Sequence, residues 1–327
     1  MNGHGVTQHI GFIGPGNMGA PMVARLLAGG TQVTVWARDP AKCTALIGSG
    51  AHLAEDMRDA VGACDLVISC LASPEVLESA YLASDGLVSV ARPGQIFVDH
   101  TTTSPRTAAD IADALSKKSA QFLDAPVSGG PQRAAEGSLV SFVGGPPEAL
   151  DAVRHVLTHY TAAVHRCGDN GSGQSLKLVN QLLVIIHAVA AAEAASLVDS
   201  SGIDPLLARR ALAGGWAASA MVDYVLPRAL AGEFTPEGAT VRGLAEVASL
   251  VSAFLEDAKT DSSLFAAALV SFRSALSAGL GGAGLGALIE TVVHLPEGVA
   301  GKDEPAEAMV TVEPEVRITE SQAQQRR

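Results

Sequence analysis

Aromatic residues and cysteines are scarce in this chain. Phenylalanine, tryptophan and tyrosine make up 4% of its 327 residues, although hydrophobic residues as a whole make up 48%. This hydrophobic share excludes a largely disordered chain and suffices for a sizeable core. The four cysteines form no Cys-x-x-Cys pair and do not alternate with histidines at the spacing of metal ligands. We therefore expect free thiols in a reducing compartment and no bound metal.

Basic residues are also in short supply. Lysine and arginine number 22 against 34 aspartates and glutamates, which gives a net charge of -12. An excess of negative charge argues against a nucleic-acid partner, because such partners are bound mainly through their phosphates. If the ligand is an anion, its few basic contacts have to be placed at the site itself.

Targeting and membrane signals are missing from the sequence as well. The first residues contain no basic segment followed by an apolar run, so no signal peptide is predicted. The longest apolar stretch, from Leu182 to Val198, is interrupted by His187 and Glu193. A membrane span is therefore not expected, and we predict a cytoplasmic protein.

Short apolar runs alternate with helical patterns through the first half of the chain. Strands are expected at residues 9–13, 32–36, 65–69, 95–99, 121–124 and 139–143. This alternation predicts an α/β fold, a Rossmann-type doubly wound sheet that is mainly parallel and has helices on both faces. Ligands of such sheets bind beyond the carboxyl ends of the strands.

The second half of the chain is predicted to be helical. Residues 175–200 contain neither proline nor glycine and are apolar nearly all round, which favours one long helix buried between domains or subunits. Shorter helices are expected at 205–213, 219–231, 241–258 and 263–278. We predict a dinucleotide-binding domain over residues 1–166, an all-helical substrate and dimerisation domain over 167–296 and a disordered tail over 297–327. The apolar helix faces favour a homodimer or homotetramer.

A glycine-rich motif separates the first expected strand from the first helix. Gly14, Gly16 and Gly19 form a G-x-G-x-x-G pattern that encloses Asn17 and Met18. The first glycine permits a tight turn, the second lets a pyrophosphate approach the backbone, and the third allows close packing of helix on strand. The helix N-terminus adds free N–H groups and partial positive charge. This segment predicts a dinucleotide site.

The residue after the second strand bears on the choice of cofactor. An acidic side chain that binds the adenosine ribose is expected about 20 residues beyond the glycines. Arg38 stands 19 residues after Gly19, with Asp39 beside it. Arginine pairs well with a 2′-phosphate, so the sequence favours NADP. In the alternative, Arg38 covers the adenine and Asp39 binds the ribose of NAD.

Two further segments point to a reaction. One runs from Asp124 through Ser128 to Gly130, and the other leads from Gly171 through Lys177 to Asn180. Together with the G-x-G-x-x-G motif, they resemble the β-hydroxyacid dehydrogenase family. That family includes 3-hydroxyisobutyrate, L-threonate and tartronate-semialdehyde enzymes, with 6-phosphogluconate dehydrogenase as a larger relative. The resemblance extends over about residues 9 to 290.

The resemblance implies roles for particular residues. Ser128, Gly129 and Gly130 match the segment that holds the substrate carboxylate, and a hydroxyl with exposed glycine N–H groups suits an anion. Lys177 matches the catalytic lysine, which protonates the oxygen in reduction or takes the hydroxyl proton in oxidation. Asn180 lies on the same helical face and is expected to orient that hydroxyl. The alternative for Lys177 is a surface lysine with a buried stem.

Two loops complete the implied site. Thr102 matches the family's segment near the nicotinamide and is a candidate contact for cofactor or substrate. Leu71 occupies the position of a cofactor loop that usually reads Leu-Pro. The expected function is hydride transfer between NADP(H), or alternatively NAD(H), and a small anionic β-hydroxy acid or its semialdehyde or keto acid.

The late helix departs from the family pattern. The family usually has a Lys-Asp-Leu triplet there, and its lysine falls on Ala245 when counted without gaps or on Arg242 with a three-residue gap. Because this lysine is missing, we expect the site to accept a larger or less charged substrate. The sequence therefore does not predict which hydroxy acid is used. His187, on the long helix, is expected to be a core histidine rather than a direct participant.

Two other functions remain open. One is a reductase of another C=O or a C=N substrate, as in the imine reductase relatives, and the other is a non-catalytic cofactor-binding protein. Both groups of relatives usually lack the lysine, so the presence of Lys177 favours the dehydrogenase.

Overall fold

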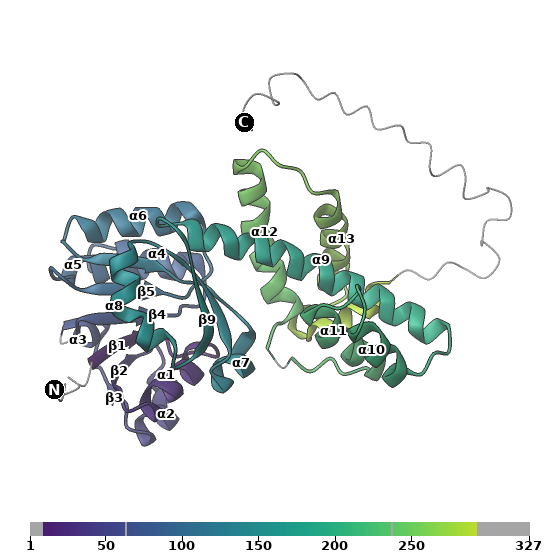
Figure 1. Cartoon of the computed structure of the whole chain (residues 1–327), viewed down its shortest axis with the longest axis horizontal. Coiled ribbons are helices and arrows are strands. Elements are labelled where there is room, and N and C mark those ends of the chain that lie inside the picture. The colour runs from purple at the N-terminus through teal and green to yellow at the C-terminus, as the bar shows by residue number, and fades with distance from the viewer. Residues whose placement is uncertain (1–8, 63, 237, 293–327) are drawn as a thin grey trace. The chain divides into compact units, whose positions relative to one another are not determined.

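The computed structural model describes residues 9–62, 64–236 and 238–292. Contacts group the chain up to Val292 into one compact unit. In this unit a sheet with flanking helices is followed by a group of helices (Figure 1). The tail predicted over 297–327 lies outside the described residues, and the domain boundaries at 166 and 296 remain predictions.

Nine strands form one sheet in the order β3-β2-β1-β4-β5-β6-β8-β7, with β9 paired to β8. The strands are β1 His9–Ile13, β2 Gln32–Trp36, β3 His52–Leu53, β4 Leu66–Ser69, β5 Ile96–Asp99, β6 Gln121–Asp124, β7 Val127–Ser128, β8 Leu139–Gly144 and β9 Thr161–Gly168. The pairs from β3 to β6 are parallel, whereas β8 runs antiparallel to β6 and β7. The carboxyl ends of the parallel strands therefore share one edge of the sheet.

Helices cover both faces of this sheet. They are α1 Gly19–Ala28, α2 Thr44–Gly48, α3 Met57–Gly62, α4 Pro74–Leu82, α5 Leu87–Val90, α6 Pro105–Ser116, α7 Gly130–Glu136 and α8 Pro147–Leu157, with the short 3-10 helix η1 Pro40–Cys43. One buried cluster joins one face to α1, α2, α7 and α8, and another joins the opposite face to α3, α4, α5 and α6. Burial of both faces explains why the strands read as continuous apolar runs.

The remaining helices pack around α9, which runs from the sheet into the helical group (Figure 1). The group comprises α9 Ser172–Ser200, α10 Pro205–Ala213, α11 Ala220–Ala231, α12 Val241–Asp257 and α13 Ser263–Ser277, followed by η2 Leu280–Gly282 and η3 Leu285–Thr291. A further apolar core joins α9 to α11, α12, α13 and η3. The one long helix predicted from the sequence thus serves as the centre of this group.

The predicted fold class is confirmed, and the six expected strands are present within about one residue of their predicted ends. Three strands were not predicted. β3 and β7 have two residues each, which is too short for a period to be recognised. β9 has eight residues of which only Thr161 is fully buried, so it lacks the apolar run that marked the others.

Among the described residues, α9 alone is long and apolar enough to cross a membrane by length and composition. Half of its most apolar window is buried inside the protein. The core helix of a soluble protein passes the same test, so these properties are weak evidence for a membrane span.

Candidate functional site

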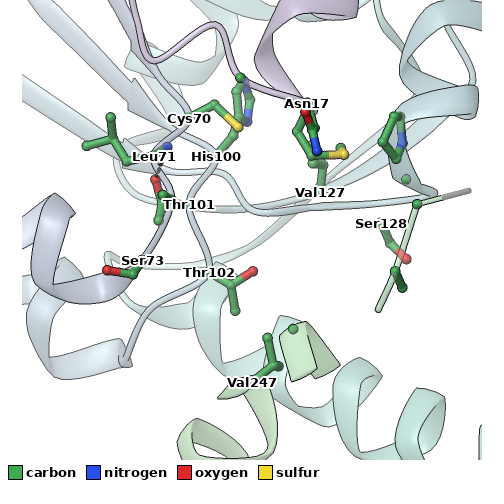
Figure 2. Close-up of a pocket in the computed structure, with 18 of the residues that line it drawn as sticks. Asn17, Cys70, Leu71, Ser73, His100, Thr101, Thr102, Val127, Ser128 and Val247 are labelled. Carbon is green, nitrogen blue, oxygen red and sulfur yellow. Dashed lines mark hydrogen bonds between the residues drawn. The ribbon is translucent and has the colours of Figure 1, made fainter. Parts of the chain in front are cut away.

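A cavity of about 2210 Å³ opens at the carboxyl ends of the strands. Its walls are formed by the loops that follow β1, β2, β4 and β5, by the segment around β7, and by α9, α11 and α12. Figure 2 draws part of this lining, with the sheet-end loops on one side and α12 on the other. Of the residues predicted from the sequence for the site, all line this cavity except Gly19.

The glycine turn after β1 has the geometry that its sequence requires. Gly14 has φ +86°, and a Cβ at this position would lie 2.6 Å from the carbonyl oxygen of Cys70. Its N–H donates to the carbonyl of Trp36 at 2.9 Å, which ties the turn to β2. Only glycine satisfies both the conformation and the close approach. The turn therefore exposes backbone to the cavity, as a dinucleotide-binding loop must.

The N-terminus of α1 is open to an anion. No side chain caps it, and its first turn contains no acidic residue. The first N–H groups of a helix and its dipole attract phosphates. Gly16, Asn17 and Met18 line the cavity at this point, whereas Gly19 packs behind them against Phe12 and Gly14. The turn and helix can thus hold a pyrophosphate.

Two cations line the cavity beyond the second strand. They are Arg38, which the sequence singled out, and Lys42 on η1, which it did not. Asp39 also lines the cavity, but its Oδ1 accepts a hydrogen bond from the N–H of Ala41 at 3.1 Å and caps η1. One carboxylate oxygen is therefore already used in local structure.

The loops after β4 and β5 are joined through a buried carboxyl group. Asp99 is fully buried and accepts hydrogen bonds at 2.7 Å from the hydroxyls of Ser69 and Thr101. The Thr101 hydroxyl in turn accepts from the N–H of Leu71 at 2.9 Å. Burial raises the pKa of Asp99 to about 7. The hydrogen bonds lower the pKa, but their effect is smaller than that of burial. These hydrogen bonds fix the backbone at Leu71 and at Thr101, and so also position Thr102, which follows Thr101 in the chain.

The segment at β7 presents backbone and a hydroxyl to the cavity. Ser128 is half-buried, and Gly129 and Gly130 follow it with φ of +136° and +74°. All three line the cavity. A hydroxyl and successive exposed N–H groups are suitable donors for a carboxylate.

Lys177 projects from α9 into the cavity although only 7% of its surface is exposed. Its Nζ donates to Oε1 of Gln181 at 2.9 Å, and Nδ2 of Asn180 donates to the same oxygen at 3.1 Å. Burial lowers the pKa of Lys177 to about 8, because the charged form loses hydration. The alternative of a surface lysine is therefore excluded, and the amine can exchange a proton near neutral pH.

Some cavity residues differ from the sequence expectation. His187 was expected in the core, but it is half-buried and lines the cavity, because this side of α9 faces the cavity. Neither Ala245 nor Arg242 lines the cavity; Val247 does, and its side chain points toward Thr102 (Figure 2). Ala245 instead packs against the helical core. Helix orientation, which no count along the sequence supplies, decides which residues face the site.

The four cysteines are free thiols, as expected. Cys43 and Cys64 are buried, whereas Cys70 and Cys167 are half-buried. Within the described residues, no group of three or more histidine, cysteine or acidic side chains is arranged to hold a metal ion.

Two family models match consecutive parts of the chain. Residues 9–168 match the NAD-binding domain of 6-phosphogluconate dehydrogenase. Residues 171–292 match the NAD-binding domain of NADP-dependent 3-hydroxyisobutyrate dehydrogenase. The two matches meet just before α9.

Characterised proteins resemble the chain over most of its length. A 3-hydroxyisobutyrate dehydrogenase of Pseudomonas aeruginosa is 35% identical over 71% of this chain and 80% of its own length. An NAD-dependent L-serine dehydrogenase of the same organism is 36% identical, over 64% of this chain and 72% of its own. The solved complex of Psf3 with NADP+ and 2-OPP superimposes with a TM-score of 0.81 at 29% identity, covering 87% of this chain and all of that one.

Proposed function

The chain belongs to the β-hydroxyacid dehydrogenase family and is a nicotinamide-dependent oxidoreductase, and we propose that it transfers a hydride between NADP(H) and a small β-hydroxy acid or its semialdehyde or keto acid. One observation carries this proposal: a buried lysine amine, an anion-binding segment and a dinucleotide turn line a single cavity. Dinucleotide turns alone occur in many enzymes, whereas the combination specifies the chemistry around a substrate oxygen.

The residues around the cavity fit a nicotinamide dinucleotide. The turn at Gly14, the open N-terminus of α1 and the loop at Leu71 supply backbone donors and an apolar contact. When bound, the nicotinamide supplies or accepts the hydride. The chain itself orients the substrate and moves the proton.

On this proposal the substrate is held at two points. Ser128 and the N–H groups of Gly129 and Gly130 bind its carboxylate. Asn180 and Lys177 contact its hydroxyl or carbonyl oxygen, since both lie on one face of α9 and share Gln181 as a partner. Fixing both ends of a short molecule holds its reacting carbon in one orientation.

Lys177 is the proposed proton donor and acceptor. With a pKa lowered to about 8 by burial, the amine is largely protonated at neutral pH yet able to lose its proton. In reduction the ammonium protonates the substrate oxygen, and in oxidation the neutral amine takes the hydroxyl proton. In the resting site, Oε1 of Gln181 accepts from the ammonium.

The cavity favours NADP over NAD at the adenosine end. Arg38 and Lys42 provide two positive charges where a 2′-phosphate would be bound, and one oxygen of Asp39 is occupied by the N–H of Ala41. A ribose hydroxyl would need an acidic acceptor there, whereas a phosphate needs cations.

The far wall of the cavity favours a substrate with an uncharged tail. Val247 and Leu250 of α12 line it together with Leu183 and Val184 of α9, with Glu246 and Ser249 of α12 also in the lining. The four apolar side chains offer dispersion contacts and no donors, and the carboxylate of Glu246 disfavours a second negative charge on the substrate. We propose a β-hydroxy acid whose substituent is apolar.

A spectrophotometric screen tests the function. Purified protein is assayed at 340 nm with β-hydroxy acids, their semialdehydes and keto acids, each with NADP(H) and NAD(H). The expected result is turnover of short β-hydroxy acids, faster with NADP. Cofactor binding without turnover over the whole panel would contradict the proposal and favour a cofactor-binding protein.

We also propose that the chain forms a homo-oligomer through one face of α9. Leu176, Val179 and Leu197 are 40%, 46% and 69% exposed, and helical periodicity puts all three on the same side of α9, where a partner would cover them. A double substitution Leu176→Glu with Leu197→Glu is expected to lower the mass measured by light scattering to that of a monomer. Ile47→Glu, at an exposed position on α2, serves as the control. An unchanged mass in the double variant would contradict this surface.

A further inference from the structure

The helix that carries Lys177 has no cap of its own. α9 begins after Gly171, no side chain of its own segment caps it, and its first turn has no acidic residue. A helix leaves its first N–H groups unpaired, and burying them without partners is costly. The partners for this helix therefore have to come from elsewhere in the chain.

Asp124, at the end of β6, supplies them. Its carboxylate is fully buried, with Oδ1 accepting from the N–H of Gly171 at 2.8 Å and Oδ2 from the N–H of Gln174 at 3.0 Å. A Cβ at Gly173 would lie 2.8 Å from Oδ2, so only glycine lets the helix approach this closely. The negative charge also stands at the positive end of the helix.

The side chain of Gln174 makes a second attachment, to the loop after β5. It is fully buried, its Oε1 accepts from the N–H of Thr103 at 3.0 Å, and its Nε2 donates to the carbonyl of Thr101 at 2.8 Å. Between these two residues lies Thr102, which lines the cavity. Thr101 is the same residue whose hydroxyl holds the N–H of Leu71. Gln174 thus links the helix to the loops on the cofactor side.

We propose that Asp124 and Gln174 form a brace that positions Lys177 for the reaction. Lys177 follows Gln174 by one helical turn, so the two attachments fix its amine relative to Thr102 and Leu71. Both are positioning residues, because they act through the helix and do not touch the reacting atoms. The inference rests on the proposed function, in which Lys177 exchanges the proton.

A pair of buried glutamines allows a matched test. Gln95 lies just before β5, at the opposite end of that strand, and is 1% exposed. Its side chain also bonds only to backbone: it accepts from the N–H of Arg92 at 2.7 Å and donates to the carbonyls of Cys64 at 2.7 Å and Val61 at 3.1 Å. Replacing either glutamine with methionine keeps the length of the side chain and removes its hydrogen bonds. We expect the Gln95 variant to lose at least as much stability as the Gln174 variant, because Gln95 makes three hydrogen bonds and Gln174 two, and only the Gln174 variant disturbs the brace.

We expect Gln174→Met to lower kcat by about tenfold or more, since small misplacements of a catalytic group are costly. Cofactor Kd should change little, because the turn at Gly14 is untouched. The pH dependence of kcat should also shift upward as more water reaches the amine of Lys177. Gln95→Met should lower the melting temperature at least as much and leave kcat and its pH profile unchanged. Equal effects of both variants on kcat, or no effect of Gln174→Met, would overturn the proposal.

Hydrogen–deuterium exchange provides a readout that does not depend on turnover. Amides of residues 171–178 are expected to exchange faster in Gln174→Met and in Asp124→Asn, and at the wild-type rate in Gln95→Met. If the wild type has no turnover on any substrate, the proposed function fails and exchange alone decides on the brace. If Asp124→Asn does not fold, Gln174→Met decides. Wild-type exchange at 171–178 in Gln174→Met would overturn the brace.

Discussion

The proton chemistry of the site depends on the environment of one amine. Lys177 projects from α9 into the cavity, its Nζ donates to Oε1 of Gln181, and burial lowers its pKa to about 8. A surface lysine would stay charged throughout the physiological range and would be a poor base. The value of this residue to the reaction therefore comes from its burial.

Lys177→Met is expected to lower turnover by about 10²- to 10⁴-fold, the usual contribution of a general acid or base, while cofactor affinity measured by fluorescence titration stays close to wild type. In the wild type, kcat for reduction should fall as pH rises past about 8, because the ammonium is the donor. For oxidation, kcat should rise through the same range. Lys118→Met, at an exposed position, is the control. Near-wild-type turnover of Lys177→Met would exclude the mechanism.

A second prediction at the residue scale concerns the choice of cofactor. Arg38→Ala is expected to raise the Kd of NADP by about tenfold, because a charge-assisted pair with the 2′-phosphate is lost. The Kd of NAD should change far less, and Lys42→Ala should act in the same direction. Binding is measured by titration with each cofactor. Equal losses for both cofactors would mean that Arg38 contacts the adenine and not the phosphate.

At the scale of elements, the orientation of α12 decides what the substrate meets. This helix turns Val247 toward Thr102 and turns Ala245 into the helical core (Figure 2). The cavity therefore receives an isopropyl group from α12 near this point. A substrate with a charged tail would have to bury that charge against it, which is costly without a partner.

Val247→Lys is expected to reverse the substrate preference. The variant should lose about tenfold or more in kcat/KM for β-hydroxy acids with an apolar substituent, and should gain activity on those with a second carboxylate. Val247→Ala is the matched control, since it enlarges the cavity without adding charge. The ratio of kcat/KM for the two substrate classes is the measurement. A ratio that does not change in Val247→Lys would show that this wall does not contact the substrate.

At the scale of the whole molecule, the buried carboxyl groups connect the site to stability. Burial raises the pKa of Asp99 to about 7, well above its ordinary value. Between about pH 4 and 7 the folded protein thus holds a proton that the unfolded chain has released. This group therefore makes the free energy of unfolding fall as pH rises through that range. His100, whose pKa burial lowers to about 4, acts in the opposite direction.

Comparison with Asp99→Asn isolates this contribution, because His100 is common to both proteins. The unfolding free energy of wild type minus that of the variant is expected to fall by up to about 1.4 kcal/mol per pH unit up to pH 7 and to stay level above it. Urea unfolding followed by circular dichroism at several pH values gives the difference. A constant difference between pH 5 and 7 would contradict the raised pKa.

Much of this architecture was predictable because its signals are local. Strands such as β1 are short apolar runs, and the long helix lacks breakers, so neighbouring residues suffice to identify them. The turn at Gly14 is recognisable for the same reason, since its glycines, strand and helix follow one another. The sequence could not reveal β9, whose half-exposed residues gain their order from pairing with β8.

The candidate site divides in the same way. Sequence alone determined the sheet-and-helix fold, the family and the residue types offered for the site, because motifs and periodicity are written in neighbouring positions. Tertiary structure alone decided that Lys177 is buried, that Val247 rather than Ala245 faces the cavity, and that Asp124 caps a helix 47 residues away. These properties depend on desolvation, helix rotation and long-range hydrogen bonds, which exist only once distant segments have packed.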